Sequence, residues 1–226
     1  MEMNIIVACE ESQRVCTAFR EKGHNAFSCD LIPCSGGHPE WHIQGDVLQI
    51  IAPKIRGGNI NFSTADGQIH TVDKWDMMIA HPPCTRLCNS GQRWLYWGDD
   101  KYKSAKISEQ QKAIVFFMLL ITADIEKIAL ENPNGIMSSA YRKPDCSYNP
   151  YDFEGETESK KTCLWLKNLN PLMPTRLVSL PKEERTQGIW KAHFDGRKLA
   201  WNDPETARLR SQTPIGVAKA MADQWG

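Results

Sequence analysis

Short apolar runs alternate with an amphipathic stretch at the start of the chain. Residues 4–9 (NIIVAC) and 25–30 (NAFSCD) are apolar runs of the length of a strand buried in a sheet. Between them, residues 12–22 carry apolar side chains at helical spacing, with Ser12 as the expected cap and Gly23 as the expected stop. This order predicts a β-α-β unit.

Two later apolar runs end abruptly at prolines. Residues 77–80 (MMIA) are followed by a histidine, two prolines and Cys84, and residues 125–130 (IEKIAL) are followed by Glu131, an asparagine and a proline. Proline does not donate to a strand ladder and fixes its own φ, so it ends a strand and stiffens the loop after it. Neighbouring parallel strands lie about 5 Å apart, or twice that if one strand intervenes. We therefore expect Cys84 and Glu131 to face one substrate.

The remaining segments complete the predicted fold. Residues 42–46 form a short expected strand, and residues 47–51 a helical turn. An Asp-Gly pair between two alternating segments predicts a β-hairpin insertion over residues 54–74. Residues 108–125 have the wide apolar face of a long helix. Together these elements predict one α/β domain over residues 1–226, with a mostly parallel sheet and helices on both faces.

Composition and charge limit the functions that the chain can have. The 226 residues contain 27 Lys and Arg and 27 Asp and Glu, so the formal net charge is zero and any nucleic-acid contact has to come from local basic patches. No apolar run reaches the roughly 18 residues of a membrane span, and no signal peptide is evident, so we expect no membrane partner. Eight scattered cysteines suit a reducing compartment, which predicts a cytoplasmic protein.

One spacing superficially resembles a zinc site. Cys29, Cys34, His38 and His42 have the spacing C-x4-C-x3-H-x3-H. Cys29 closes an expected strand, however, and the gap between the two cysteines is at the wide limit of structural zinc sites. We therefore predict no metal.

The turn after the first expected strand favours a positively charged cofactor. Residues 9–12 (CEES) lack the glycines of a dinucleotide loop, and their two acids would repel a pyrophosphate. S-adenosylmethionine, a sulfonium with an amino-acid tail and no phosphate, fits this turn. Asp30 is a candidate for the ribose hydroxyls of such a cofactor, and Asp46 for its adenine amino group. Either residue could instead cap a helix or turn.

The segment that follows Cys84 combines basic and aromatic residues. Such residues stack on bases and pair with phosphates, so residues 85–106 are interpreted as a substrate loop rather than an ordinary surface loop with anchoring aromatics. The residues concerned include Arg86, Arg93, Trp94, Tyr96 and Trp97.

These residues resemble a known family. The sequence His81-Pro82-Pro83-Cys84, followed by Glu131-Asn132-Pro133, is similar to the PPC and ENV motifs of the DNA (cytosine-5) methyltransferases. Other segments occur in the family's order: the turn 9–12, the strand end 29–31, the GD pair 45–46, the basic stretch 158–165 and the closing motif 212–222. The resemblance implies a Rossmann-like S-adenosylmethionine-dependent methyltransferase fold and DNA, or a pyrimidine nucleotide, as partner.

The resemblance also implies the site residues. The catalytic residues would be Cys84, Glu131, Lys160 and Lys161. The cofactor-binding residues would be Cys9, Glu10, Ser12, Asp30, Leu31, Asp46, Val47, His81 and Pro82. The substrate-binding residues would be Pro83, Arg86, Asn89, Arg93 and Asn132.

The family chemistry explains why these residue types occur together. C5 of cytosine becomes nucleophilic when a thiolate adds at C6, and Cys84 would supply that thiolate, favoured by positive charge from Arg86, Lys160 or Lys161. Glu131, protonated or sharing a proton with N3, would draw charge from the ring. The methyl group would come from S-adenosylmethionine.

The chain also departs from the family pattern. The cofactor turn lacks the family's glycines, and Lys160 and Lys161 stand where arginines are usual. Residues 168–210 are too few for a full target-recognition domain and form either a reduced nucleic-acid-binding lobe or a basic excursion. Three hypotheses follow: methylation of cytosine C5 in DNA, the same chemistry on RNA or a free pyrimidine nucleotide, and a binding protein that does not catalyse.

Overall fold

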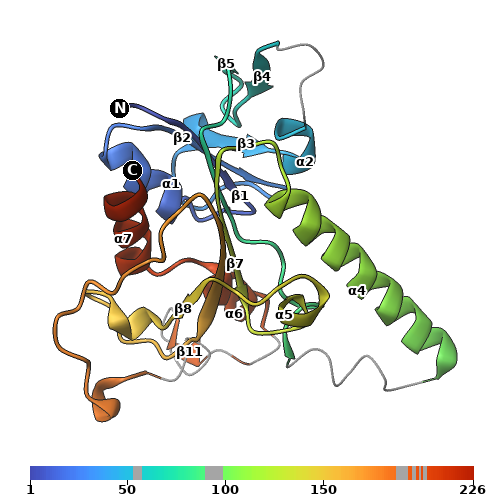
Figure 1. Ribbon diagram of the computed structural model, residues 1–226, viewed down its shortest axis with the longest axis vertical. Coiled ribbons are helices and arrows are strands. Elements are labelled where there is room, and N and C mark those ends of the chain that lie inside the picture. The colour runs from blue at the N-terminus through green and yellow to red at the C-terminus, as the bar shows by residue number, and fades with distance from the viewer. Residues whose placement is uncertain (53–57, 90–98, 187–192, 195–196, 199, 201–202) are drawn as a thin grey trace.

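One sheet organises the molecule. The computed structural model describes residues 1–52, 58–89, 99–186, 193–194, 197–198, 200 and 203–226. Within these residues a sheet of seven strands forms the centre (Figure 1). Across the sheet the strands are β3 (His42–Gln44), β2 (Asn25–Asp30), β1 (Asn4–Ala8), β6 (Met77–Ala80), β7 (Lys127–Pro133), β9 (Thr162–Lys167) and β8 (Cys146–Tyr148).

The topology confirms an α/β, Rossmann-like fold with a mostly parallel sheet. β3, β2, β1, β6 and β7 are parallel, whereas β9 runs antiparallel to both β7 and β8. The strand order turns back after β1, because β2 lies on one side of it and β6 on the other. In open α/β sheets, ligands bind outside the carboxyl ends of the strands at such a switch point.

Helices cover both faces of the sheet. α1 (Arg14–Glu21) and α7 (Ile215–Trp225) pack on one face, and α2 (Val47–Ile50) and α4 (Asp100–Ile121) pack on the other (Figure 1). Each side has its own apolar core, because successive side chains of a strand point to opposite faces. Two further short helices are α5 (Met137–Ala140) and α6 (Pro204–Ser211).

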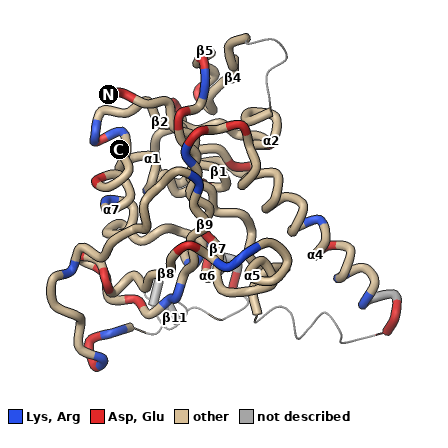
Figure 2. Tube along the Cα trace, viewed as in Figure 1, with Lys and Arg blue, Asp and Glu red and all other residues tan. Residues whose placement is uncertain are grey.

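Charge is distributed without a dominant sign. Figure 2 shows Lys and Arg interspersed with Asp and Glu along the described part of the trace.

Among the described helices, none combines the length and the apolar character needed to cross a bilayer.

The predicted hairpin is present. β4 (Ile60–Ser63) pairs antiparallel with β5 (Ile69–Val72), and Gly67 adopts φ 87° in the turn between them. Phe62 packs edge-on against Phe27 of β2 with ring centroids 4.9 Å apart, which anchors the hairpin to the core.

The described part of the 168–210 segment holds little regular structure. It contains a 3-10 turn at Lys182–Glu184, the short pair β10 (His193–Phe194) and β11 (Arg197–Lys198), and most of α6 at its end. Two further 3-10 turns lie at Pro39–Trp41 and Pro150–Asp152. The proposed recognition lobe therefore stays a prediction.

Three predicted boundaries were wrong. α4 begins at Asp100 rather than at residue 108, because the polar first turns of this helix carry no apolar period. β7 runs on to Pro133, which pairs with Thr162 of β9, so the proline marks the last position of the strand rather than cutting it earlier. The first strand ends at Ala8, because Cys9 adopts a left-handed φ of 58°.

The start of α1 also differs from the prediction. Gln13, not Ser12, precedes the helix, and it has a left-handed φ of 59° and makes no side-chain cap. The Glu10 carboxylate caps the helix instead, accepting from the backbone N–H groups of Val15 at 2.7 Å and Cys16 at 3.2 Å. An anion at a helix N-terminus is stabilised by the helix dipole as well as by these hydrogen bonds.

We predict that Gly67→Ala weakens the hairpin, because a Cβ is strained at positive φ. The expected loss is about 1 kcal/mol in the free energy of unfolding, measured as a lower urea midpoint with an unchanged slope. Gly58→Ala is the matched control, since a Cβ there meets no atom within 4 Å and its φ is not positive. An equal effect of the two substitutions would contradict the role assigned to Gly67.

Candidate active site at the carboxyl edge of the sheet

The strand register brings the candidate residues to one edge. Ala8 of β1 is paired with Ala80 of β6, and Ala80 is paired with Leu130 of β7. The next residue of each strand, Cys9, His81 or Glu131, therefore emerges at the same level of the sheet. Because β1, β6 and β7 are adjacent and parallel, the loops that follow them border one site.

The Cys84 loop is fastened to the loop that follows β7. The Asn132 side-chain amide donates to the Pro82 carbonyl at 2.8 Å, and the Ile136 N–H donates to the Leu87 carbonyl at 2.9 Å. The backbones approach so closely at Gly135 that a Cβ there would lie 1.9 Å from the Leu87 carbonyl oxygen. These contacts fix Cys84 relative to Glu131.

Cys84 itself lies at the start of a tight turn. Its carbonyl accepts hydrogen bonds from the N–H groups of Leu87 and Cys88, both at 2.9 Å. The pKa of the Cys84 thiol is raised by the hydrogen bond with the Cys88 side chain, by burial and by the nearby charge of Glu131. Lys160 acts in the opposite direction but is outweighed.

The expectation of a resting thiolate at Cys84 is therefore corrected. Positive charge was expected to favour the thiolate, but burial and two negatively ionising neighbours favour the thiol. Arg86 does not contribute, because its guanidinium pairs with Glu109 of α4, with Nε 2.7 Å from Oε2.

Glu131 is ionised in the free protein, whereas the sequence led us to expect it either protonated or sharing a proton with N3 of the substrate. Its side chain is 17% exposed, and its Oε2 lies 3.3 Å from Nδ1 of His81. Burial raises the pKa of Glu131, but the hydrogen bond from His81 and the charge of Lys160 outweigh it, so the net pKa is lowered. The carboxyl group is thus ionised at neutral pH rather than kept protonated.

The two predicted catalytic lysines are placed differently. The charge of Lys160 contributes to lowering the pKa of both Cys84 and Glu131, and its Nζ donates to the Arg210 carbonyl at 2.8 Å. Lys161 is exposed, and its charge contributes to lowering the pKa of Cys163 instead. The structure therefore brings Lys160 to the site and does not bring Lys161 there.

A second group of predicted residues gathers at the ends of β1, β2 and β3. Burial raises the pKa of the Cys9 thiol to about 12, with further contributions from the charges of Asp30, Cys29 and Asp46. The two aspartates thus lie beside Cys9. Asp46 also accepts from the Leu48 N–H at 3.0 Å and caps α2, and Asp30 accepts from the Ile32 N–H at 3.3 Å.

The structure also places four other residues that were predicted to bind the cofactor. Glu10 is committed to capping α1, and Val47 is buried in the core beneath α2. Leu31 is 72% exposed, whereas Ser12 is buried. Cofactor contacts by these residues stay predictions.

The predicted substrate-binding residues also differ from one another in their surroundings. Pro83 and Asn89 are exposed beside Cys84, whereas Asn132 is buried and holds the Pro82 carbonyl. Arg86 is paired with α4. Arg93 and the aromatic residues 94, 96 and 97 lie outside the described residues.

The structure also adds residues that sequence analysis missed. Burial and the nearby charge of Glu131 raise the pKa of Tyr148, and a hydrogen bond with Thr162 contributes to lowering the pKa of Glu131. Cys88 makes the largest contribution to the raised pKa of Cys84. Only Cys88 had a signal in the sequence, as a second cysteine in the loop that follows the two prolines.

Three buried polar atoms at this edge have no hydrogen-bond partner among the described residues. They are Oε1 of Glu11, Nε2 of His81 and Oδ1 of Asn132. Buried polar groups are almost always paired, so unpaired atoms just after β1 and β6 and in the last residues of β7 are a sign of a functional site. The carboxylate acceptors Asp30, Asp46 and Glu11 fit a cofactor that carries hydroxyl, amino and positively charged groups.

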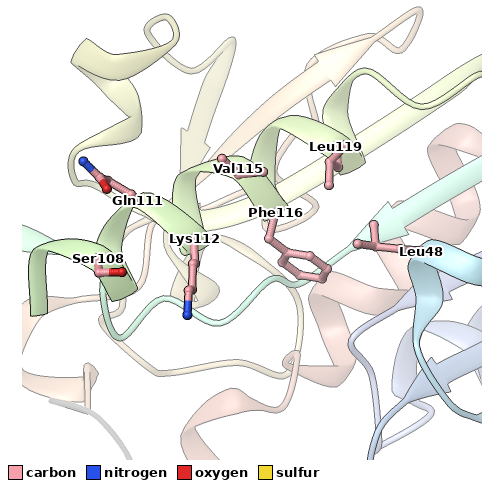
Figure 3. A pocket seen from close by; sticks show the side chains of 7 residues that line it. All are labelled: Leu48, Ser108, Gln111, Lys112, Val115, Phe116 and Leu119. Atoms are coloured by element: carbon pink, nitrogen blue, oxygen red, sulfur yellow. The ribbon is translucent and has the colours of Figure 1, made fainter. Parts of the chain in front are cut away.

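A groove on the α4 face is separate from this edge. It has a volume of about 360 Å³ and is lined by Leu48, Ser108, Gln111, Lys112, Val115, Phe116 and Leu119 (Figure 3). None of the predicted site residues lines it. Among the described residues, no three His, Cys, Asp or Glu side chains gather as a metal site.

Comparison with known proteins returns remote structural likenesses. A solved structure described as a DNA modification methyltransferase encoded within an E. coli prophage matches with a TM-score of 0.45 and 13% identity, over 79% of this chain and 53% of that chain. The Entamoeba histolytica methyltransferase EhMeth matches with a TM-score of 0.39 and 14% identity, over 82% of this chain and 58% of that one. The chain thus spans little more than half the length of these two proteins.

These likenesses carry no argument about function. No protein-family model and no curated protein sequence matches the chain. The functional argument rests on the site itself.

We predict that the Cys84 thiol is alkylated slowly at neutral pH and progressively faster as the pH rises beyond 9. Glu131→Gln and Cys88→Ala should each speed its alkylation at pH 8 several-fold, because each removes a group that raises its pKa, and one pKa unit changes the thiolate fraction about tenfold. Peptide mass spectrometry after iodoacetamide pulses measures the rates, with the Cys146 peptide of the same sample as internal reference. A half-maximal rate near pH 7, unchanged by either substitution, would contradict the assigned electrostatics.

Proposed function

We propose that this protein transfers a methyl group from S-adenosylmethionine to C5 of cytosine in DNA, through a covalent adduct between Cys84 and C6. The observation that supports this most is the pairing of a thiol and a carboxylate at the ends of adjacent parallel strands. Glu131 contributes to the raised pKa of Cys84, so the two groups lie close enough to interact. A nucleophile and a proton-transfer group facing one space are what covalent catalysis on a pyrimidine ring requires.

The methyl donor would lie along the ends of β1, β2 and β3. Asp30 would hold its ribose hydroxyls and Asp46 its adenine amino group, while the acidic turn after β1 suits its positive charge. When bound, S-adenosylmethionine supplies an electrophilic methyl group. The chain's own residues do the rest, because cytosine C5 does not take a methyl group until the ring has been activated.

Cys84 activates the ring by adding to it. The Cys84 sulfur forms a bond to C6, the electron pair of the C5–C6 double bond moves onto C5 and into the ring, and a proton is delivered to N3. C5 then uses that electron pair to bond the methyl group. Loss of the C5 proton to water restores the double bond and expels the sulfur as a thiolate, which takes back the proton from N3, so that Cys84 is regenerated and the product is 5-methylcytosine.

Polymeric DNA is the substrate that the surrounding residues support. In a duplex the target base has to leave the stack before a buried thiol can reach C6. Lys160 precedes β9 and acts electrostatically on both Cys84 and Glu131, and a lysine at this place can pair with a phosphate.

The test is methyl transfer from tritiated S-adenosylmethionine to DNA, RNA and dCMP in parallel. DNA should be labelled, and nuclease digestion should return the label as 5-methylcytosine. Cys84→Ser should lower the rate at least about 10³-fold, because the nucleophile is lost. Cys146→Ser, at a half-buried cysteine on the edge strand β8, is the control and should leave the rate within a factor of two.

Other outcomes assign the other hypotheses. Label only in RNA or dCMP would replace DNA by that substrate and keep the chemistry. DNA binding without transfer, unaffected by Cys84→Ser, would identify a binding protein. Label on an exocyclic amino group would refute the Cys84 mechanism.

A further inference from the structure

The polar contact of His81 is directed at Glu131. The His81 side chain is 7% exposed, its Nδ1 lies 3.3 Å from Oε2 of Glu131, and its Nε2 has no hydrogen-bond partner among the described residues. Because an ionised carboxylate only accepts hydrogen bonds, Nδ1 carries the proton that joins the two side chains. The imidazole thus contacts Glu131 through a single hydrogen-bond donor, the Nδ1–H group.

This arrangement gives the fold little stability. A buried ring nitrogen without a partner carries a desolvation cost that one hydrogen bond at 3.3 Å only partly offsets. An apolar side chain of similar size would pack between the two strand ends without that cost. The histidine is therefore better explained by what it does to Glu131 than by stability.

His81 interacts with two carboxylates. The charge of His81 contributes to lowering the pKa of Glu10, which caps α1, and the pKa of Glu131. The side-chain contact of the imidazole is thus with Glu131, although the sequence assigned His81 to the cofactor.

Titratable groups face Glu131 from each element packed against it. Among those that the structure describes are His81 after β6, Cys84 in the loop beyond it, Tyr148 of β8, Lys160 before β9 and Cys163 of β9. Of these, only His81 and Lys160 lower the pKa of Glu131, and the hydrogen bond from His81 is the larger effect. Glu10 faces His81 from the loop after β1.

We propose that His81 is a positioning residue for the methyl transfer: its Nδ1–H fixes the orientation of the Glu131 carboxylate, so that Glu131 receives the thiol proton of Cys84 as the sulfur attacks C6. This inference rests on the proposed function. The S–H bond breaks as the S–C6 bond forms, and the proton goes to Glu131. Glu131 then passes the same proton to N3 as negative charge develops on the ring, so no further reactant is needed.

The test compares substitutions that keep or remove the donor. The amide nitrogen of Asn in His81→Asn overlies Nδ1, whereas His81→Gln places its amide near Nε2 and His81→Ala has none. His81→Asn should keep kcat within about threefold of the unsubstituted protein, and His81→Ala and His81→Gln should lower it about tenfold or more. Calorimetry should show S-adenosylmethionine bound equally by all variants.

The pH profile separates positioning from a general structural effect. The acid limb of kcat/KM reports ionisation of Glu131, which the His81 hydrogen bond shifts to lower pH. Without the donor, burial raises the pKa of Glu131, so the limb should move to higher pH by about one unit in His81→Ala and His81→Gln but not in His81→Asn. Thermal melting confirms folding, and if His81→Ala does not fold, the His81→Asn and His81→Gln pair decides.

The failure of this inference can be told from failure of the proposed function. If the unsubstituted protein methylates no pyrimidine, the pKa of Glu131 is read directly by carbon-13 carboxyl resonances, assigned with Glu131→Gln. A higher pKa in His81→Gln than in His81→Asn would support the inference, and equal values would overturn it. Weaker cofactor binding with an unmoved acid limb would also overturn it and return His81 to the cofactor site.

Discussion

The strand register across β1, β6 and β7 is the constraint on which the site depends. Ala8, Ala80 and Leu130 are paired in one row, so the three loops that follow leave the sheet at one level. A shift of one residue would turn every side chain to the opposite face of the sheet. His81 and Glu131, which lie on the same face and contact each other, would then be separated, and the thiol loop would lose its attachment to Asn132.

The electrostatics of the site follow from this arrangement. A half-buried thiol beside an ionised carboxylate stays protonated, and a half-buried carboxylate beside a histidine donor and a lysine stays ionised. The Cys84 thiol is therefore expected to react slowly in the free protein. Under the proposed mechanism the thiolate would form only as the sulfur adds to the substrate ring, which would protect the nucleophile from oxidation and alkylation.

The sequence predicted the backbone of the site better than its charges. Prolines close to Cys84 and Glu131 mark strand ends through covalent geometry alone. Asp66-Gly67 marks a hairpin because only certain residues adopt positive φ. Both features could therefore be recognised from the sequence alone. The ionisation of Cys84 and Glu131 depends on His81, Cys88 and Lys160, whose approach is set by packing. Glu10 was assigned to the cofactor because it stands in the right turn, yet it caps α1, since a left-handed Gln13 redirects the chain. The polar start of α4 carried no apolar period and was missed for that reason.

The central claim is that Cys84 adds to C6 of cytosine, and a mechanism-based trap tests it most directly. Duplex DNA with 5-fluorocytosine in place of cytosine is incubated with the protein and S-adenosylmethionine, and the products are digested and mapped by mass spectrometry. Because a C5 fluorine is not lost as a proton is, the adduct cannot resolve, and the account predicts a stable methylated cross-link at Cys84. A cross-link at another cysteine, or unmodified protein together with DNA methylated elsewhere on the base, would contradict it.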